Sequence, residues 1–175
     1  LTGQLEFVNV AKNYVDIKDF HELVQRIIHP AEGHGKIGGK GAGLFLAQQI
    51  LRRHGAEVGL DEVPVPRTWY VSSDGIYDFV RSNHLEDVLT HKYKEIEEIR
   101  QEYPDIIQVF KHSHFPADIV KGLSIALDDL GDRPLIVRSS SLLEDRFGAA
   151  FSGKYKSLFL ANQGSKQDRL NALTD

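Results

Sequence analysis

The sequence has no cysteine and no methionine, and it contains a single tryptophan among 175 residues. Without cysteine the chain cannot form a disulfide, use thiolate chemistry or build a zinc ribbon. This composition is compatible with a reducing compartment, and we expect a cytoplasmic protein. The chain also lacks a run approaching the roughly 18 apolar residues of a membrane helix, and its start lacks a signal-peptide pattern. We therefore expect no membrane partner.

The charge balance is slightly acidic. Lysine and arginine number 21 and aspartate and glutamate number 25, which gives a formal net charge of −4. Nucleic-acid-binding domains usually carry a basic face, so we expect no nucleic-acid partner. With 41% hydrophobic and 26% charged residues, the composition is that of one globular domain or of one lobe of a larger domain.

Two features of the sequence indicate a piece of a longer polypeptide. The chain begins at Leu1 rather than at methionine, and residues 166–175 have the pattern of a helix that has just begun, with Ser165 as its cap. We expect further domains in the full-length protein.

Hydrophobic periodicity predicts several helices. Residues 16–28 carry apolar side chains at helical spacing and are expected to form one amphipathic helix that Pro30 ends. A glycine-dense loop follows, and then a helix to about Arg53 with Gly55 as its stop. The expected apolar face of this helix consists of Leu44, Ala47, Ile50 and Leu51.

The segment 85–130 is rich in charge and helical in character, and we expect it to form a helical insert. Pro104 is expected to break its first part into two helices, because proline removes a helical hydrogen bond. The last helix, from Pro116 to Leu130, is expected to end at Gly131.

Short strands are predicted between these helices. Residues 68–71, 135–137 and 155–160 are rich in β-branched and aromatic side chains. The first is followed by possible caps of a short helix, namely Ser72, Ser73 and Asp74. We therefore expect a mixed α and β fold of the α+β class.

The loop 33–43 is the first candidate site. Dense glycine lets backbone N–H groups approach an anion, the following helix offers its positive end, and Lys40 adds a charge suited to phosphate. A Walker loop is excluded because Gly41, not serine or threonine, follows Lys40. A dinucleotide-binding turn would need a preceding strand. A flexible connector between helices is the alternative.

The second candidate follows the strand at 135–137. Arg138 stands at the carboxyl end of this strand, and its planar guanidinium suits bidentate contact with phosphate. Serines follow it, and then the acids Glu144 and Asp145. The alternative is a solvated strand end in which Arg138 forms a salt bridge with one of these acids.

The third candidate is the small-residue segment 147–154, which could form a flap in which Phe151 excludes water. An ordinary hairpin loop is the alternative. His112 and His114 lack a third ligand at suitable spacing, so we expect surface histidines and no metal site. Trp69 and Tyr70 are expected in the core.

Taken together, three blocks resemble the ATP-binding domain of the pyruvate phosphate dikinase and phosphoenolpyruvate synthase family. The first block is residues 37–44, IGGKGAGL. The second joins residues 63–66, VPVP, to residues 69–74, WYVSSD. The third joins residues 135–140, LIVRSS, to residues 144–145, ED, and 150–153, AFSG. Their order and spacing agree across roughly residues 35–165.

The resemblance implies an ATP-grasp fold, of which this chain would hold the first lobe. Residues 1–34 would be a helical lead-in, 35–165 the lobe with its insert at about 85–130, and 166–175 the start of a truncated helix. Lys40 and Arg138 match the family residues that contact the phosphates of ATP. The matched nucleotide-binding set is Gly39, Lys40, Gly41, Arg138, Ser139, Ser140, Glu144, Asp145, Phe151, Ser152 and Gly153.

The resemblance also implies an activity. Family members move a phosphoryl group from ATP to a histidine on a swivelling domain and from there to pyruvate, giving phosphoenolpyruvate. The partners would be this histidine domain and the second ATP-grasp lobe, and the Mg2+ ligands are expected outside this sequence. Two other functions stay open: a nucleotide-sensing regulatory module, and a dikinase that acts on a glucan or an antibiotic.

Overall fold

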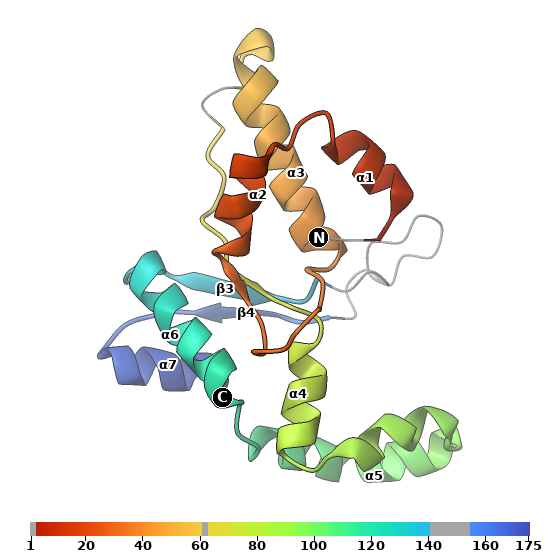
Figure 1. The fold of residues 1–175 in the computed structure, drawn as a ribbon. Helices are drawn as coiled ribbons and strands as arrows, with labels where there is room; N and C mark the ends of the chain where they lie inside the picture. Colours follow the sequence, from red (N-terminus) through yellow and green to blue (C-terminus); the bar gives the residue numbers. More distant parts are fainter. Residues whose placement is uncertain (1–2, 61–62, 141–154) are drawn as a thin grey trace.

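The computed structural model describes residues 3–60, 63–140 and 155–175 (Figure 1). This part of the chain is helix-rich with two small two-stranded sheets, so it has the mixed α and β class that the sequence predicts. The helices are α1 (Leu5–Ala11), α2 (Ile17–Val24), α3 (Gly39–His54), η1 (Gly55–Val58), α4 (Gly75–Ser82), η2 (Glu86–Tyr93), α5 (Ile96–Lys111), α6 (Ala117–Leu130) and α7 (Lys166–Thr174). The strands are β1 (Ile27–Ile28), β2 (Tyr70–Val71), β3 (Leu135–Arg138) and β4 (Ser157–Leu160).

The parallel pair β1–β2 joins the helices above and below it in Figure 1. Ile27 and Tyr70 are register partners and both pack on a cluster beside α3. The next residue of β1, Ile28, lies in a second cluster with α6, because successive side chains of a strand point to opposite faces. The buried residues of the first cluster are Leu23, Ile37, Ala42 and Phe45, and those of the second are Ile28, Ile119 and Ala126.

The structure has a shorter helix than the one expected over residues 16–28. Asp16 and Asp19 form a capping box at its start, but α2 ends at Val24, and Ile27–Ile28 form β1 instead. The helical continuation was wrong because the pairing with β2, about forty residues further along the chain, overrides the local periodicity.

Helix α3 begins at Gly39 and has Gly55 as its C-cap, as expected. Its buried face differs from the expected one. Phe45 and Leu46 are buried, whereas Leu44 and Ala47 are exposed; Ile50 and Leu51 are partly buried. The face is rotated because α3 packs on α2 and on Tyr70 through Ala42 and Phe45.

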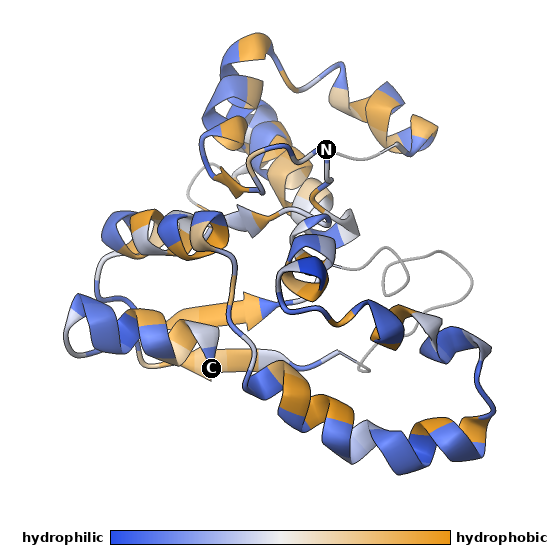
Figure 2. Ribbon diagram, turned by 60° about the horizontal axis from the view of Figure 1, so that its bottom comes forward, coloured by the Kyte–Doolittle hydropathy of each residue, from blue (hydrophilic) through white to orange (hydrophobic). Residues whose placement is uncertain are grey.

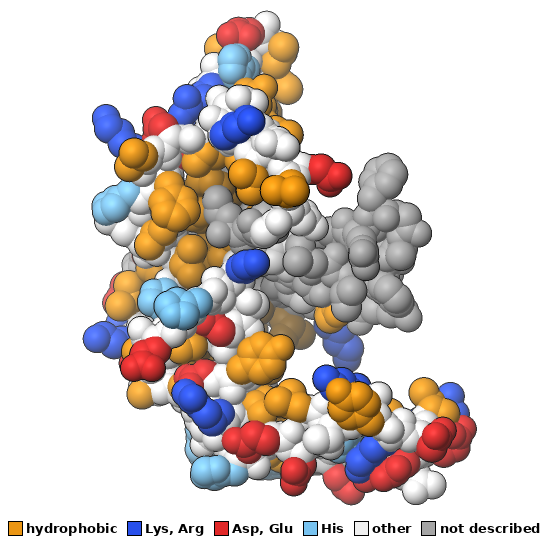
Figure 3. Space-filling model, turned by 45° about the vertical axis from the view of Figure 1, so that its right-hand side comes forward, with side chains coloured by type: hydrophobic (Ala, Val, Ile, Leu, Met, Phe, Trp, Pro, Cys, Tyr) orange, Lys and Arg blue, Asp and Glu red, His pale blue; other side chains and the backbone are white. Residues whose placement is uncertain are grey.

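Helices η2 and α5 form the arm at the lower right of Figure 1. Pro104 lies inside α5, so the expected break there is wrong; the interruption falls at Lys94 and Glu95, which have extended backbone. Pro104 faces solvent, where water can pair the carbonyl group that its missing N–H leaves free. Figure 3 shows acidic and basic side chains mixed along this arm, and Lys94 donates to Glu102 at 2.6 Å.

The antiparallel ribbon β3–β4 confirms both predicted strands, with Arg138 paired with Ser157. Figure 2 shows both strands as hydrophobic. The chain turns back beside this ribbon at Asn162, whose amide donates at 2.8 Å to the carbonyl groups of Gly131 and Arg133. Gly131, the predicted helix stop, has a φ of +69°, which glycine adopts without strain.

Asp129 of α6 forms hydrogen bonds with the segment that leads into β2. It accepts hydrogen bonds from the Arg67 guanidinium and from the Trp69 indole, the latter at 2.7 Å. The Arg67 guanidinium lowers the pKa of Asp129; partial burial raises it, and the Trp69 hydrogen bond lowers it further. The net result is a pKa below the ordinary value of 3.8.

This arrangement predicts acid sensitivity. A carboxyl group whose pKa is lower in the folded state stabilises the fold at neutral pH, and this contribution is lost as the pH falls through the folded pKa. We expect the free energy of unfolding to decrease below about pH 5. Asp129→Asn should be about 1 kcal/mol less stable at pH 7 and should lose less on acidification. Urea denaturation at several pH values measures both effects, and an unchanged pH dependence in the variant would contradict the assignment.

Among the described residues, no helix combines the length and the apolar character needed to cross a membrane.

Candidate functional site

The site is built around the N-terminus of α3. This helix has 16 residues. Its N-cap residue is Gly38, so no side-chain hydrogen bond from the N-cap residue caps the helix. Its first turn contains no acidic residue, whereas its last turn carries Arg52, Arg53 and His54. The positive end of the helix dipole is therefore not neutralised by acids of its own first turn, and Lys40 of that turn adds to the positive charge.

Ser140, just beyond β3, contacts the start of α3. The Gly41 amide donates a hydrogen bond to the Ser140 hydroxyl oxygen at 2.8 Å, across 99 residues of sequence. A Cβ atom at Gly38 would lie 2.5 Å from the carbonyl carbon of Ser140 and still closer to its oxygen. The two segments that the sequence singles out, around Lys40 and around Arg138, are therefore neighbours in the fold.

The described members of the predicted site lie on either side of this contact. Gly39, Lys40 and Gly41 form the first turn of α3. Lys40 is partly buried, and Arg138, the last residue of β3, is exposed. Ser139 and Ser140 follow directly and are partly buried. The remaining predicted residues lie outside the described residues: Glu144, Asp145, Phe151, Ser152 and Gly153.

The glycine loop before α3 is held by the segment that follows β2. The Gly35 amide donates to a carboxylate oxygen of Asp74 at 2.8 Å. The Lys36 amide donates to the Ser73 hydroxyl at 3.0 Å, and the Ser73 amide donates back to the Lys36 carbonyl at 2.9 Å. Ile37 then enters the core and is 2% exposed. These contacts fix the loop, so the alternative of a flexible connector between helices does not fit it.

Close approach explains several of the glycines. A Cβ atom at Gly35 would lie 2.8 Å from the amide nitrogen of Asp74, and one at Gly41 would lie 3.0 Å from the Tyr70 ring. Gly43, by contrast, has no neighbour within 4 Å of such an atom. The glycines at 35, 38 and 41 therefore serve the packing of the loop itself.

Asp74 has a different role from the helix cap that the sequence predicts. It occupies the N-cap position of α4, but its side chain makes no cap hydrogen bond. The carboxylate accepts from Gly35 and from the buried Ser72 hydroxyl instead. No local pattern could have revealed this contact, because the two segments are 39 residues apart in sequence.

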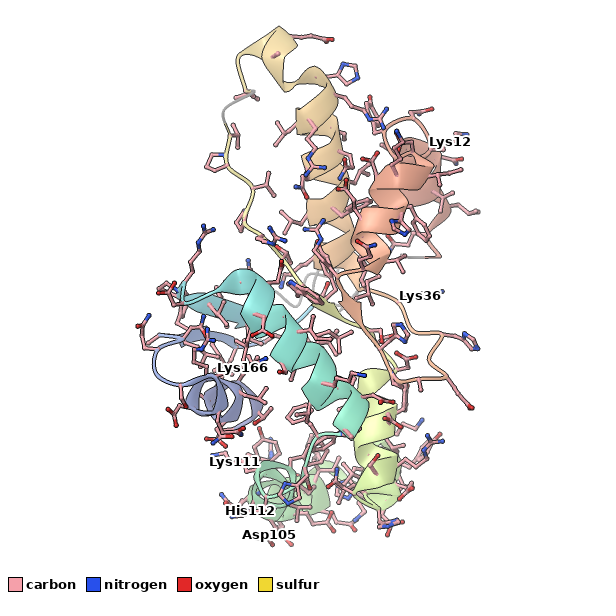
Figure 4. The ribbon with its side chains drawn as sticks, turned by 60° about the vertical axis from the view of Figure 1, so that its left-hand side comes forward. Lys12, Lys36, Asp105, Lys111, His112 and Lys166 are labelled. Carbon is pink, nitrogen blue, oxygen red and sulfur yellow. The ribbon has the colours of Figure 1, made fainter. Side chains whose placement is uncertain are left out.

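The other candidates lie elsewhere or in the core. Trp69 and Tyr70 pack against the two buried clusters, as predicted. The His112 ring interacts with the Gln108 carbonyl at 2.7 Å. Figure 4 places His112 at α5, well away from Lys36 of the glycine loop. The described residues contain no group of three or more His, Asp or Glu side chains that could hold a metal ion.

A comparison with protein families gives the decisive observation. The family described as the AMP/ATP-binding domain of pyruvate phosphate dikinase matches residues 34–175, which include the glycine loop and the β3–β4 ribbon. The chain belongs to this family. No curated protein and no solved structure matches the chain.

The family description agrees with the chemistry of this region. An AMP/ATP-binding domain must hold phosphate, and the N-terminus of α3 with Lys40 is a cationic, donor-rich element. Helices α1 and α2 precede the matched range, yet Leu23 of α2 packs beneath α3. The segment before the match is therefore part of the support of the nucleotide-binding domain.

Proposed function

We propose that this AMP/ATP-binding domain is the first lobe of an ATP-grasp site in a phosphotransferase resembling phosphoenolpyruvate synthase and pyruvate phosphate dikinase. The enzyme would move a phosphoryl group from ATP to a histidine on a swivelling domain, and from there to pyruvate. One observation carries this proposal: the hydrogen bond from Gly41 to Ser140 brings the Lys40 turn against the end of the Arg138 strand.

The roles of the residues follow from their chemistry. The start of α3 would direct N–H groups and the Lys40 ammonium toward the triphosphate. Arg138 would bind a phosphate oxygen pair with its planar guanidinium. Ser140 accepts from Gly41 and still has its own hydroxyl proton to donate. Phosphoryl transfer depends mainly on positioning and on neutralising charge, which these groups would supply.

The remaining parts of the proposal concern segments beyond the described site. The lobe would span residues 35–165, and Glu144, Asp145, Phe151, Ser152 and Gly153 would complete the nucleotide contacts. The Mg2+ ligands would lie on the second lobe; the described residues contain no group of three or more His, Asp or Glu side chains that could hold the ion. The phosphohistidine domain and the second lobe would be the partners in the full-length chain.

Titration calorimetry of MgATP into the full-length protein tests the proposal. Lys40→Ala and Arg138→Ala should each weaken binding by about 1–3 kcal/mol, because each removes a charge-assisted contact. Both side chains are at least partly exposed, so the variants should keep the far-ultraviolet circular dichroism of the wild type.

A matched control is Arg133→Ala, which removes an exposed arginine before β3 and should leave MgATP affinity unchanged. Equal affinity in wild type, Lys40→Ala and Arg138→Ala would place the nucleotide elsewhere. If binding depends on both residues but incubation with ATP yields no phosphohistidine, the protein is a nucleotide sensor rather than a transferase.

A further inference from the structure

The carboxylate of Asp74 faces the glycine loop rather than its own helix. One oxygen accepts the Gly35 amide at 2.8 Å, and the other accepts the Ser72 hydroxyl. Ser72 is buried, and its own amide donates to the Ile28 carbonyl at 2.9 Å, which continues the β1–β2 ladder. The acceptor for the loop therefore lies on the segment that directly continues the β1–β2 pair.

Asp74 is charged at neutral pH. Partial burial raises its pKa, but the hydrogen bond from Ser72, together with backbone hydrogen bonds from Gly35, from Asp74 itself and from His34, brings the pKa below its ordinary value of 3.8. A hydrogen bond to a charged acceptor is roughly twice as strong as one between neutral groups. The loop is therefore held by a strong contact at Gly35, and by Ser73 at the next residue.

The held segment leads directly to Lys40. Only four residues separate Gly35 from Lys40, and one of them, Ile37, is fixed in the core. Beyond Lys40, Gly41 is bound by Ser140. The first turn of α3 is therefore fixed on both sides of Lys40, by Asp74 and Ser73 before it and by Ser140 after it.

We propose that Asp74, supported by Ser73, is a positioning residue that sets the glycine loop so that Lys40 and the start of α3 meet the triphosphate. This inference rests on the proposed nucleotide site. Asp74 does not touch the nucleotide in this account, since a carboxylate would repel phosphate; it acts through the Gly35 amide.

The test compares ATP with adenosine, which lacks the phosphates. In the full-length protein, Asp74→Ala should weaken MgATP binding about tenfold, because a loop displaced by about 1 Å misaligns the phosphate donors. Adenosine affinity should stay within about twofold of the wild type, because the base and ribose do not depend on this loop. Asp74→Asn keeps an acceptor for Gly35 and should restore most of the MgATP affinity.

Asp129→Ala is the matched control, because it also removes a hydrogen-bonded carboxylate that joins the β2 segment to another element. It should lower the thermal midpoint without changing the ratio of ATP to adenosine affinity. Ser73→Ala leaves the carboxylate in place but removes the acceptor for the Lys36 amide, and it decides the question if Asp74→Ala does not fold.

The outcomes separate the two proposals. A selective loss of MgATP affinity in Asp74→Ala or Ser73→Ala, absent in Asp129→Ala, supports the positioning role. A loss that is equal for ATP and adenosine, or no loss while Lys40→Ala weakens binding, overturns it and leaves the nucleotide site intact. If Lys40→Ala binds MgATP as well as the wild type, the proposed function itself fails.

Discussion

Replacing Gly38 by alanine should lower the free energy of unfolding by about 3 kcal/mol, toward the upper end of the usual cost of adding atoms to a packed region. The added Cβ would overlap the carbonyl group of Ser140, which is backbone and cannot rotate away. Either α3 or the end of β3 must then move. The same substitution should also weaken MgATP binding, because it separates the Lys40 turn from Arg138.

Gly43→Ala is the control for this experiment. Gly43 lies in α3, five residues after the N-cap Gly38; its φ is not positive, and a Cβ atom there has no neighbour within 4 Å. Alanine is the better helix former by about 1 kcal/mol, so this variant should be as stable as the wild type or more so. Urea denaturation followed by circular dichroism measures both. Equal stability of the two variants would show that Ser140 does not approach Gly38 in solution.

Phe45→Ala should be the most destabilising single truncation in the support of the site, at about 3–5 kcal/mol. Phe45 is 1% exposed and packs with Leu23 of α2, with Ile37 of the glycine loop and with Ala42. Its removal leaves a cavity where the glycine loop, α2 and α3 meet. The free energy of unfolding of a small domain is only about 5–15 kcal/mol, so this truncation should remove a large part of it.

The neighbouring Leu44→Ala variant provides the comparison. Leu44 is 38% exposed, and its truncation should cost about 1 kcal/mol or less. The sequence periodicity places Leu44, and not Phe45, on the packed face of this helix. Urea denaturation therefore distinguishes the two faces directly, and a larger loss in Leu44→Ala than in Phe45→Ala would favour the face predicted from the sequence.

These contrasts show what local sequence can predict. Gly55 and Gly131 end their helices as expected, and Ser165 caps α7 with Asp168 in a capping box. Such features depend on neighbours within a few residues, so the chain itself contains the necessary information. The strands at Leu135–Arg138 and Ser157–Leu160 were likewise predicted from their composition.

The errors have a common physical cause. Ile27 and Ile28 fit a helical repeat, but a strand partner about forty residues away determines their conformation. Asp74 has the chemistry of a cap, but the Gly35 amide is its partner. Tertiary contacts overrode local preference in both cases, and periodicity contains no information about which distant segment comes near.

The sequence singles out the two segments of the candidate site but not the contact between them. Lys40 and Arg138 were singled out from residue chemistry and from a family resemblance, and the fold places their segments in contact through Ser140. The role of the loop glycines was not predictable, because it depends on the close approach of Asp74 and Ser140 rather than on flexibility.

The hydrogen bond from Gly41 to Ser140 has a consequence for the order in which the domain folds. Its two ends are 99 residues apart, and the loop contacts of Asp74 and Ser73 span 39 and 37 residues. Helices form in about a microsecond, whereas contacts between distant segments require the closure of long loops and form late. On the ribosome, α3 emerges long before Ser140 is synthesised. The contact between the Lys40 turn and the end of β3 therefore forms only after Ser140 has been made, 99 residues after Gly41, and so it forms late relative to α3 itself.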